Sequence, residues 1–388
     1  MFGRTDYWNH AGKTGALLLV LAALLIGLPL AGAAVAGRDL APYLEFPPRT
    51  RFVPHAPFSW PVFIALAAAL AAAVLPFVVR VARAGVFRQP RRYPFPWWGW
   101  LGIGILTAAW VLAWNRFAWL GALQAHTFTP LWIGYILVVS ALTVRRTRRC
   151  LLRDRPLRFL ALFPLSAALW WFFEYLNRFV QNWHYAGVAE LTAAEYFWRA
   201  TLPFSTVLPA VLVTRDWLAS FPRLDRAFGN FHSIVVPHPA PLAWATLVAA
   251  GAGLAAIAAW PDYLFALLWI APLLIIVPLQ AVAGDETIFS RIHAGDWRAV
   301  VLPAIAALIC GVFWELWNYR SLARWEYTIP FVQRFEVFEM PLLGYAGYLP
   351  FGLECAAFAG LILKGTSKNS VLPTEHRVHC GDAEARSD

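Results

Sequence analysis

Two glutamates, each followed by an asparagine at the same spacing, are the residues of this sequence whose arrangement first points to chemistry. Glu174 precedes Asn177, and Glu315 precedes Asn318, by three positions. Because positions i and i+3 share one face of a helix, each glutamate and its asparagine project together. A carboxyl group among aromatic rings can act as a general acid, so both glutamates are candidate catalytic residues. The alternative is that each pair cross-links helices by hydrogen bonds to the backbone or to a nearby arginine.

A third glutamate, Glu354, lies deep in an apolar stretch near the end of the chain. Helical rise places it about 20 Å below the outer edge of the last predicted span. Pro350 removes a helical hydrogen bond, and Gly347 and Gly352 permit close approach of a neighbour, so we expect a bend or a cavity beside this acid. Glu354 is therefore the candidate proton donor, and Glu354→Gln is expected to abolish activity. The alternative is a buried glutamate that bonds a neighbouring helix.

These acids stand in a chain whose composition indicates a membrane protein. Of its 388 residues, 60% are hydrophobic and 14% are charged, and its mean hydropathy is +0.56. Soluble domains carry roughly 25% charged residues, so this composition excludes an ordinary soluble enzyme. The net charge of +10 comes from short arginine clusters between apolar runs. Such clusters set membrane topology and do not form a nucleic-acid surface.

Apolar runs long enough to cross a bilayer recur along the chain, as expected for an all-α, polytopic transmembrane bundle. The fourth and sixth runs are short enough to be tilted or broken helices, which gives about ten spans within a range of roughly nine to eleven. The predicted spans are 15–37, 59–81, 97–115, 128–144, 157–176, 199–215, 241–260, 262–282, 298–318 and 341–363.

Most of the 32 basic residues gather on one side of these spans. The positive-inside rule therefore places both termini in the cytoplasm and the protein in the inner membrane. The first span ends in a small-x-small signal-peptidase pattern at 34–36, but its apolar run is longer than a signal peptide's, which favours a retained anchor. We expect residues 364–388 to form a mobile cytoplasmic tail. The predicted outer segments are 38–58, 116–127, 177–198 and 319–340.

The sequence repeats itself at an offset of 141 residues. Ordered matches among Glu, Asn and Pro are less frequent by chance than matches among Trp and Phe, which supports a duplication. The matches are Phe172 with Phe313, Glu174 with Glu315, Asn177 with Asn318, Glu195 with Glu336 and Pro209 with Pro350. Each unit holds four spans, so the copies insert in the same orientation about an axis along the membrane normal. The predicted divisions are two N-terminal spans in 1–96, one unit in 97–220, the second in 221–363 and the tail in 364–388.

Aromatic pairs follow both acids. After a one-residue insertion, Trp183 and Tyr185 match Trp325 and Tyr327. Each glutamate lies about 25 Å along its helix, close to the outer edge of a roughly 30 Å core, which predicts these rings beside the acids at the outer interface. The alternative is that the rings are interface anchors. The candidate substrate-binding residues are Asn177, Asn318, Trp183, Trp325, Tyr185, Tyr327 and Glu336.

Histidines and cysteines give no sign of a bound metal or haem. All nine histidines fall in predicted loops or in the tail, so the paired transmembrane histidines that hold a b-type haem are missing. The cysteines, Cys150, Cys310, Cys355 and Cys380, have no CxxC spacing and are expected to be structural thiols. We expect no cofactor and no metal, and membrane lipids as the partners.

One segment of the second unit resembles a known family. The order of a Trp-x-Tyr at Trp325-Glu326-Tyr327, a glycine, Leu349-Pro350, the acid Glu354 and a later phenylalanine resembles the integral-membrane lycopene cyclase domain. The resemblance implies a bundle of small helical repeats in which membrane acids protonate a polyene, with Glu354 as the acid. The family has two adjacent acids after its proline, whereas here a single glutamate follows at a longer distance.

Together these patterns predict an integral inner-membrane enzyme that acts on a lipid or isoprenoid by acid catalysis, within the membrane or at its outer interface. Trp and Tyr faces would stabilise developing positive charge. Two other classes stay open. One is a proton-coupled transporter of a small or lipidic solute with its path between the repeats, and the other is a structural subunit of a membrane complex.

Overall fold

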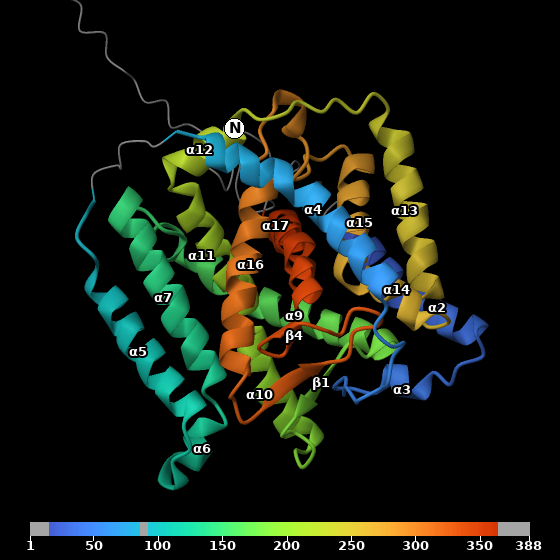
Figure 1. The fold of residues 1–388 in the computed structure, drawn as a ribbon, viewed down its shortest axis with the longest axis horizontal. Coiled ribbons are helices and arrows are strands. Elements are labelled where there is room, and N and C mark those ends of the chain that lie inside the picture. The colour runs from blue at the N-terminus through green and yellow to red at the C-terminus, as the bar shows by residue number, and fades with distance from the viewer. Residues whose placement is uncertain (1–14, 86–91, 364–388) are drawn as a thin grey trace, which may run out of the picture.

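About 70% of the described chain is helical, as expected for an all-α bundle. The computed structural model describes residues 15–85 and 92–363. Within these ranges nine helices are long and apolar enough to cross a membrane, and a tenth apolar helix, α15 (Leu267–Val282), is shorter. The protein is an all-α, multi-pass bundle of the membrane type (Figure 1). The ten helices coincide with the ten predicted spans, whereas the predicted tail and Cys380 lie outside the described residues.

The nine long helices are Gly15–Val35, which includes η1 (Ala23–Gly27) and α2 (Leu28–Val35); α4 (Trp60–Arg83); α5 (Trp97–Trp114); α7 (Phe128–Thr147); α9 (Pro156–Val180); α10 (Ala193–Phe204) with α11 (Val207–Ala219); α13 (Pro239–Ala256); α16 (Arg298–Asn318); and η4 (Leu342–Gly347) with α17 (Tyr348–Leu363). The short elements between them are α3 (Ala41–Leu44), η2 (Ala118–Leu120), α6 (Gly121–Gln124), α8 (Leu151–Asp154), β1 (Trp183–Ala186), α12 (Pro222–Gly229), α14 (Pro261–Leu264), η3 (Ile292–Ala294), β2 (Arg324–Tyr327), β3 (Glu336–Val337) and β4 (Met340–Pro341).

The sixth predicted span is broken, whereas the fourth is a continuous helix, α7. The break separates α10 from α11 and frees backbone groups that a helix would otherwise pair. The hydroxyl of Ser166, on α9, forms hydrogen bonds with backbone groups on both sides of the break. It donates to the carbonyl oxygen of Phe204 at 2.6 Å and accepts from the backbone N–H of Leu208 at 2.9 Å. A single side chain therefore stabilises a bend inside the membrane-type bundle.

Corresponding helices of the two predicted units pack in corresponding pairs. In the first, α5 packs on α7, and α7 and α9 pack on α11; in the second, α13 packs on α15, and α15 and α16 pack on α17. Two contacts between the predicted units also involve corresponding residues. Trp132 of α7 lies against Trp314 of α16 with ring centroids 5.0 Å apart, and Trp269 of α15 lies against Phe173 of α9 at 5.7 Å. Such reciprocal contacts are typical of an interface between two copies of one fold.

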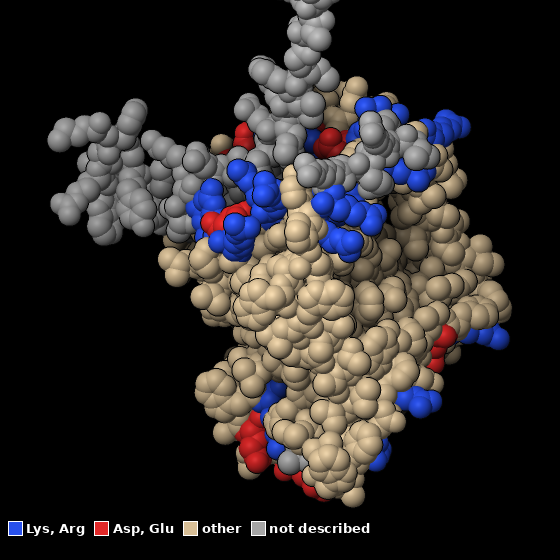
Figure 2. All heavy atoms as spheres, turned by 90° about the vertical axis from the view of Figure 1, so that its left-hand side faces the viewer, with Lys and Arg blue, Asp and Glu red and all other residues tan. Residues whose placement is uncertain are grey.

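On the face shown in Figure 2, a broad belt without charged side chains separates the two ends of the molecule. In Figure 1, α12 lies at one end, and α6, α10 and β1 lie at the other. Arginine clusters at 80–83, 145–158 and 215–226 dominate the α12 end. The opposite end carries a mixture of acidic and basic residues. An uncharged belt of this kind matches the hydrocarbon core of a bilayer.

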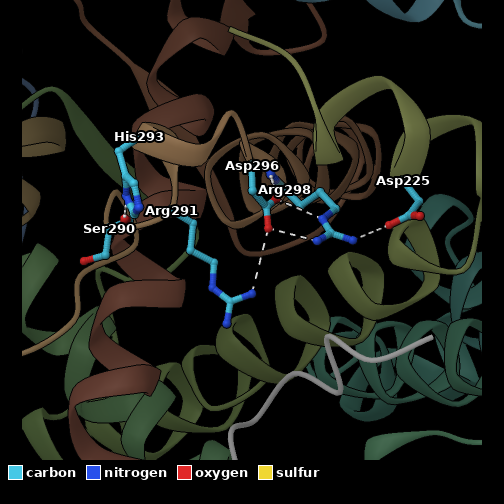
Figure 3. Close-up of polar contacts among 6 residues, drawn as sticks. All are labelled: Asp225, Ser290, Arg291, His293, Asp296 and Arg298. Atoms are coloured by element: carbon cyan, nitrogen blue, oxygen red, sulfur yellow. Dashed lines mark hydrogen bonds and ion pairs between the residues drawn. The ribbon is translucent and has the colours of Figure 1, made fainter. Parts of the chain in front are cut away.

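An arginine–carboxylate network fastens the α12 end (Figure 3). Arg298, the first residue of α16, donates to both carboxylate oxygens of Asp296 at 2.9 Å and also to Asp225 of α12. Arg291 lies 3.9 Å from the same Asp296 carboxylate. Burial by itself would raise the pKa of the Asp296 carboxyl group. The hydrogen bonds from Arg298 outweigh this effect and hold that pKa below its usual value. The network joins the loop before α16 to α12 and so fixes the end of the bundle.

Candidate functional site

The two aromatic pairs predicted beside the acids meet in a short antiparallel sheet. β1 pairs with β2 so that Trp183 lies opposite Tyr327 and Tyr185 lies opposite Trp325. Paired residues, and residues two apart on a strand, point to the same side of a sheet. The four rings therefore form one face, with tryptophan and tyrosine at alternate corners. We call this set, Trp183, Tyr185, Trp325 and Tyr327, the aromatic face.

Glu174 of α9 is fully buried behind the aromatic face. Its Oε1 accepts hydrogen bonds from the hydroxyl of Tyr185 at 2.6 Å and from the indole N–H of Trp183 at 3.2 Å. Trp170, one turn earlier on the same helix, donates a third hydrogen bond at 3.0 Å. The second oxygen, Oε2, is buried and has no hydrogen-bond partner among the described residues. One oxygen of the carboxyl group thus collects three donors, and the other is left free.

Glu315 of α16 has the same surroundings in the second unit and is also fully buried. Its Oε1 accepts from the hydroxyl of Tyr327 at 2.8 Å and from the indole N–H of Trp325 at 3.4 Å. The hydroxyl of Tyr348, at the start of α17, supplies the third donor at 2.6 Å. Oε2 again has no partner in the described part of the chain. Each glutamate is therefore held by the Trp-x-Tyr pair of its own unit.

The third donor comes from a different helix in each unit. At the 141-residue offset, Trp170 corresponds to Gly311, and Tyr348 corresponds to Val207. In the first predicted unit, the donor Trp170 lies on the helix of the glutamate, and the smaller Val207 begins α11. In the second predicted unit, Gly311 takes the place on the helix of the glutamate, and the donor Tyr348 begins α17. A Cβ atom on Gly311 would lie 2.3 Å from the ring of Tyr348, so the glycine makes room for that ring. Both arrangements give three donors to one carboxylate oxygen.

Both asparagines hold the strands in place. Asn177 donates to the carbonyl oxygen of Trp183 at 2.8 Å and accepts from the backbone N–H of Asn182 at 2.8 Å. Asn318 donates to the carbonyl oxygen of Trp325 at 2.7 Å and accepts from its N–H at 2.9 Å. Each asparagine thus fixes the strand whose tyrosine and tryptophan reach the glutamate one helical turn before it. Neither asparagine lines the cavity described next.

A cavity of about 410 Å³ lies against the aromatic face, at the end of the molecule that holds α6 and α10. Ligand sites typically enclose roughly 300–1,000 Å³ and are mostly apolar with a few placed polar groups. Both units contribute to its wall. The aromatic lining residues are Phe128, Trp170, Trp183, Tyr185, Tyr196, Phe204, Trp269, Trp314, Trp325, Tyr327 and Tyr348, and the polar ones include Gln124, Thr127, Arg199 and Ser321. The wall suits an apolar chain, and its rings can stabilise a cation.

Tyr185 and Tyr327 connect the glutamates to this cavity. Both tyrosines line the cavity, and each donates to the glutamate behind it. Burial, and then the neighbouring glutamate, raise the pKa of both phenols well above its ordinary value. The phenols therefore keep their protons at neutral pH. A proton can pass between carboxyl group and cavity only if these hydrogen bonds reverse, with the carboxyl group as the donor.

Glu354 and Glu336, the other two candidate acids, are not among the residues that line the cavity. Glu354 of α17 is fully buried, and its Oε1 accepts from the backbone N–H of Leu273 of α15 at 3.2 Å. Glu336 lies in the exposed strand β3, where it accepts a hydrogen bond from Gln333 at 2.9 Å.

The sequence predicts a close approach at both Gly347 and Gly352. It is confirmed at Gly352, where a Cβ atom would lie 2.1 Å from the carbonyl oxygen of a proline on α16. A Cβ atom on Gly347, by contrast, would lie 3.6 Å from Trp269, which is an ordinary contact.

Several residues of this site have little or no signal in the sequence. Trp170 precedes Glu174 by four positions, so helical spacing could have placed it on the same face. Tyr348 and Tyr196 could not be assigned in this way, because they reach the site from other helices. Trp269 and Trp314 line the cavity through contacts between the two units. The sequence therefore singled out both glutamates and the four rings of the aromatic face, but not the cavity that those rings line.

No protein-family model matches this chain, and no curated protein or solved structure shows significant similarity to it. The resemblance to the integral-membrane lycopene cyclase domain stays a prediction. Within the described residues, no group of three His, Cys, Asp or Glu side chains could hold a metal ion. Cys150, Cys310 and Cys355 are buried free thiols.

Proposed function

We propose that this protein is an integral-membrane enzyme that isomerises or cyclises an unsaturated, isoprenoid-type lipid by adding one proton and removing another. One observation carries the proposal: two buried glutamates, Glu174 and Glu315, each accept a hydrogen bond from a tyrosine that lines the same aromatic cavity. General acid and general base are the two roles that such a reaction needs. We assign them to this pair, with Glu354 as a buried residue outside the cavity.

The first step is a relay in the unit whose carboxyl group is protonated. The carboxyl group donates its proton to the tyrosine oxygen, and the tyrosine gives its own proton to one carbon of a double bond. The π electrons form the new C–H bond and leave a carbocation on the lipid. The tyrosine ends neutral and the glutamate ends as a carboxylate. The tryptophan faces around the cavity stabilise the cation, as aromatic rings do for other cations.

The second step removes a proton from a neighbouring carbon and restores a double bond. The carboxylate of the other unit accepts this proton through its own tyrosine, and the C–H electrons form the new π bond. The lipid leaves with its original composition, so the reaction consumes no oxidant or reductant. Exchange of protons with water returns both carboxyl groups to their starting states.

We also propose that the units 97–220 and 221–363 are copies of one another. The matched hydrogen bonds of Glu174 and Glu315 and the exchanged tryptophan contacts between the units support this duplication. The arginine clusters at the α12 end support an inner-membrane orientation with both termini in the cytoplasm. The cavity then lies toward the outer leaflet, where a lipid can enter beside α10.

A proton-coupled transporter is the second candidate, and one observation favours it. Both units contain a helix break at the same position: α11 begins at Val207 and α17 begins at Tyr348, which correspond at the 141-residue offset. Matched discontinuous helices beside a central site are typical of transporters built from repeats. The two candidates differ in their product, because a transporter leaves the chemical structure of its solute unchanged.

Lipid analysis of a deletion strain tests the proposal. The strain is complemented with the wild-type chain, Glu174→Gln, Glu315→Gln or Glu190→Gln, and its lipids are compared by chromatography and mass spectrometry. Glu190 is an exposed acid at the same end of the molecule and serves as the matched control. We expect the strain and both site variants to accumulate a lipid that is an isomer of the wild-type product. An unchanged lipid profile together with altered solute uptake would contradict the enzyme and support the transporter.

A further inference from the structure

Tyr196 gives the cavity a polar end. It lies on α10, lines the cavity and is only 4% exposed. Its hydroxyl is buried without a hydrogen-bond partner among the described residues. Its ring lies 6.4 Å from that of Tyr185, the tyrosine that contacts Glu174. An unpaired buried hydroxyl is costly, and a ligand in the cavity that Tyr196 lines can supply the missing partner.

Two arginines lie near Tyr196. Arg199, one turn further along α10, also lines the cavity and is exposed at its edge. The guanidinium carbon of Arg49 lies 5.6 Å from the centroid of the Tyr196 ring, and Arg49 donates to the carbonyl oxygen of Leu191, another lining residue. Neither arginine forms an ion pair with a carboxylate within the described residues. One carboxylate oxygen of Glu195, on the same helix as Arg199, accepts two hydrogen bonds from the N-cap threonine of α10.

We propose that the Tyr196 end of the cavity binds the phosphate or diphosphate head of a lipid whose chain fills the aromatic part. Phosphate oxygens accept hydrogen bonds from a phenol, and guanidinium groups bind them with matched geometry and charge. A neutral hydrocarbon would leave the Tyr196 hydroxyl unpaired. The inference rests on the proposed function, since it names the class of lipid that the same cavity takes.

A cationic head group is the chemical alternative. Aromatic cavities bind quaternary ammonium ions, and two glutamates lie behind this wall. Arg199 at the edge opposes that binding because its guanidinium repels a cation. The two alternatives therefore predict opposite charge preferences, which one set of probes with a common alkyl chain can measure.

The test measures the binding of dodecyl phosphate, dodecanol and dodecyltrimethylammonium to the purified full chain in lipid nanodiscs, followed by tryptophan fluorescence. We expect dodecyl phosphate to bind at least about tenfold more tightly than dodecanol, the size of one charge-assisted hydrogen bond. Tyr196→Phe should weaken phosphate binding about fivefold and Arg199→Gln about tenfold, with little effect on dodecanol. Arg38→Gln, which alters an exposed arginine before α3, is the matched control and should leave all three affinities unchanged.

Each outcome decides between the proposals. Equal binding of the phosphate and the alcohol, or tighter binding of the ammonium probe, would overturn the phosphate site and leave the proposed enzyme standing. A chain that binds none of the three probes would overturn both. Farnesyl phosphate and a two-chain phosphatidic acid then distinguish the source of the phosphate. Stronger binding of the former assigns an isoprenoid phosphate, and stronger binding of the latter assigns a phospholipid.

Discussion

A Cβ atom on Gly311 would lie 2.3 Å from Cδ2 of Tyr348. Tyr348 can therefore pack across α16 and donate to Glu315 because position 311 carries no side chain. In the first unit, the residue that corresponds to Gly311 is Trp170, which itself donates to the glutamate of that unit. Each glutamate thus has three hydrogen-bond donors on one carboxylate oxygen, although the third donor comes from a different helix in each case.

Gly311→Ala tests this relationship. The added methyl group must displace the ring of Tyr348, so we expect the free energy of unfolding to fall by about 1–3 kcal/mol, as in other overpacked cores. Thermal unfolding in detergent measures the change. Gly360→Ala is the control, because a Cβ atom there has nothing within 4 Å. An unchanged midpoint for Gly311→Ala would show that the ring has room to move.

Asn318→Ala tests the attachment of β2 to α16. The substitution removes the partner of both the N–H and the carbonyl oxygen of Trp325. Each buried backbone group left unpaired costs about 1–3 kcal/mol, so we expect a loss of at least about 2 kcal/mol in denaturant unfolding. Asn115→Ala removes one exposed hydrogen bond and should cost far less. Similar losses in the two variants would contradict the role assigned to Asn318.

Alkaline pH should weaken the aromatic face. The pKa values of Tyr185 and Tyr327 are raised in the folded chain, chiefly by burial. A phenol with a raised folded-state pKa contributes stability that is fully present below its unfolded value of about 10 and is lost as pH rises through the folded value. We expect fewer phenolates at about pH 11 in the folded chain than in the unfolded chain, measured by ultraviolet absorbance. This difference should shrink when both tyrosines are replaced by phenylalanine; an unchanged difference would show that other tyrosines carry it.

Glu354→Gln and Glu354→Ala separate a structural role from a catalytic one. Glutamine keeps an acceptor for the N–H of Leu273, whereas alanine removes it. We expect Glu354→Gln to retain turnover and stability, and Glu354→Ala to lose about 1–3 kcal/mol of folding stability. If Glu354→Gln folds normally but has no activity, Glu354 is the proton donor that the sequence first indicated.

Single-cysteine labelling tests the orientation. In a chain without its native cysteines, positions near 50, 120, 190 and 330 should react with a membrane-impermeant reagent in intact cells. Positions near 150 and 225 should react only after permeabilisation, because they lie in or beside the arginine clusters that the positive-inside rule keeps in the cytoplasm. Reaction of position 150 in intact cells would reverse the orientation.

The sequence predicts the spans well because a bilayer demands a minimum apolar length, which can be counted along the chain. It also predicts the burial of Glu354, since helical rise gives depth. Depth does not say which neighbour a side chain faces, and Glu354 is not among the residues that line the cavity at the aromatic face. Tyr348 and Tyr196 reach that cavity from separate helices. Their positions depend on tertiary packing, which no local pattern contains.

Reaction in deuterium oxide tests the acid–base proposal most directly. The purified chain is incubated in deuterated buffer with lipids extracted from the deletion strain, and the products are analysed by mass spectrometry. We predict that each product molecule carries a deuterium bound to carbon, for the wild-type chain and for Glu190→Gln alike, because the proton added to the double bond comes from an exchangeable carboxyl group. Glu174→Gln and Glu315→Gln should form little or no such product. Products without deuterium, or wild-type rates in both glutamine variants, would contradict the proposal.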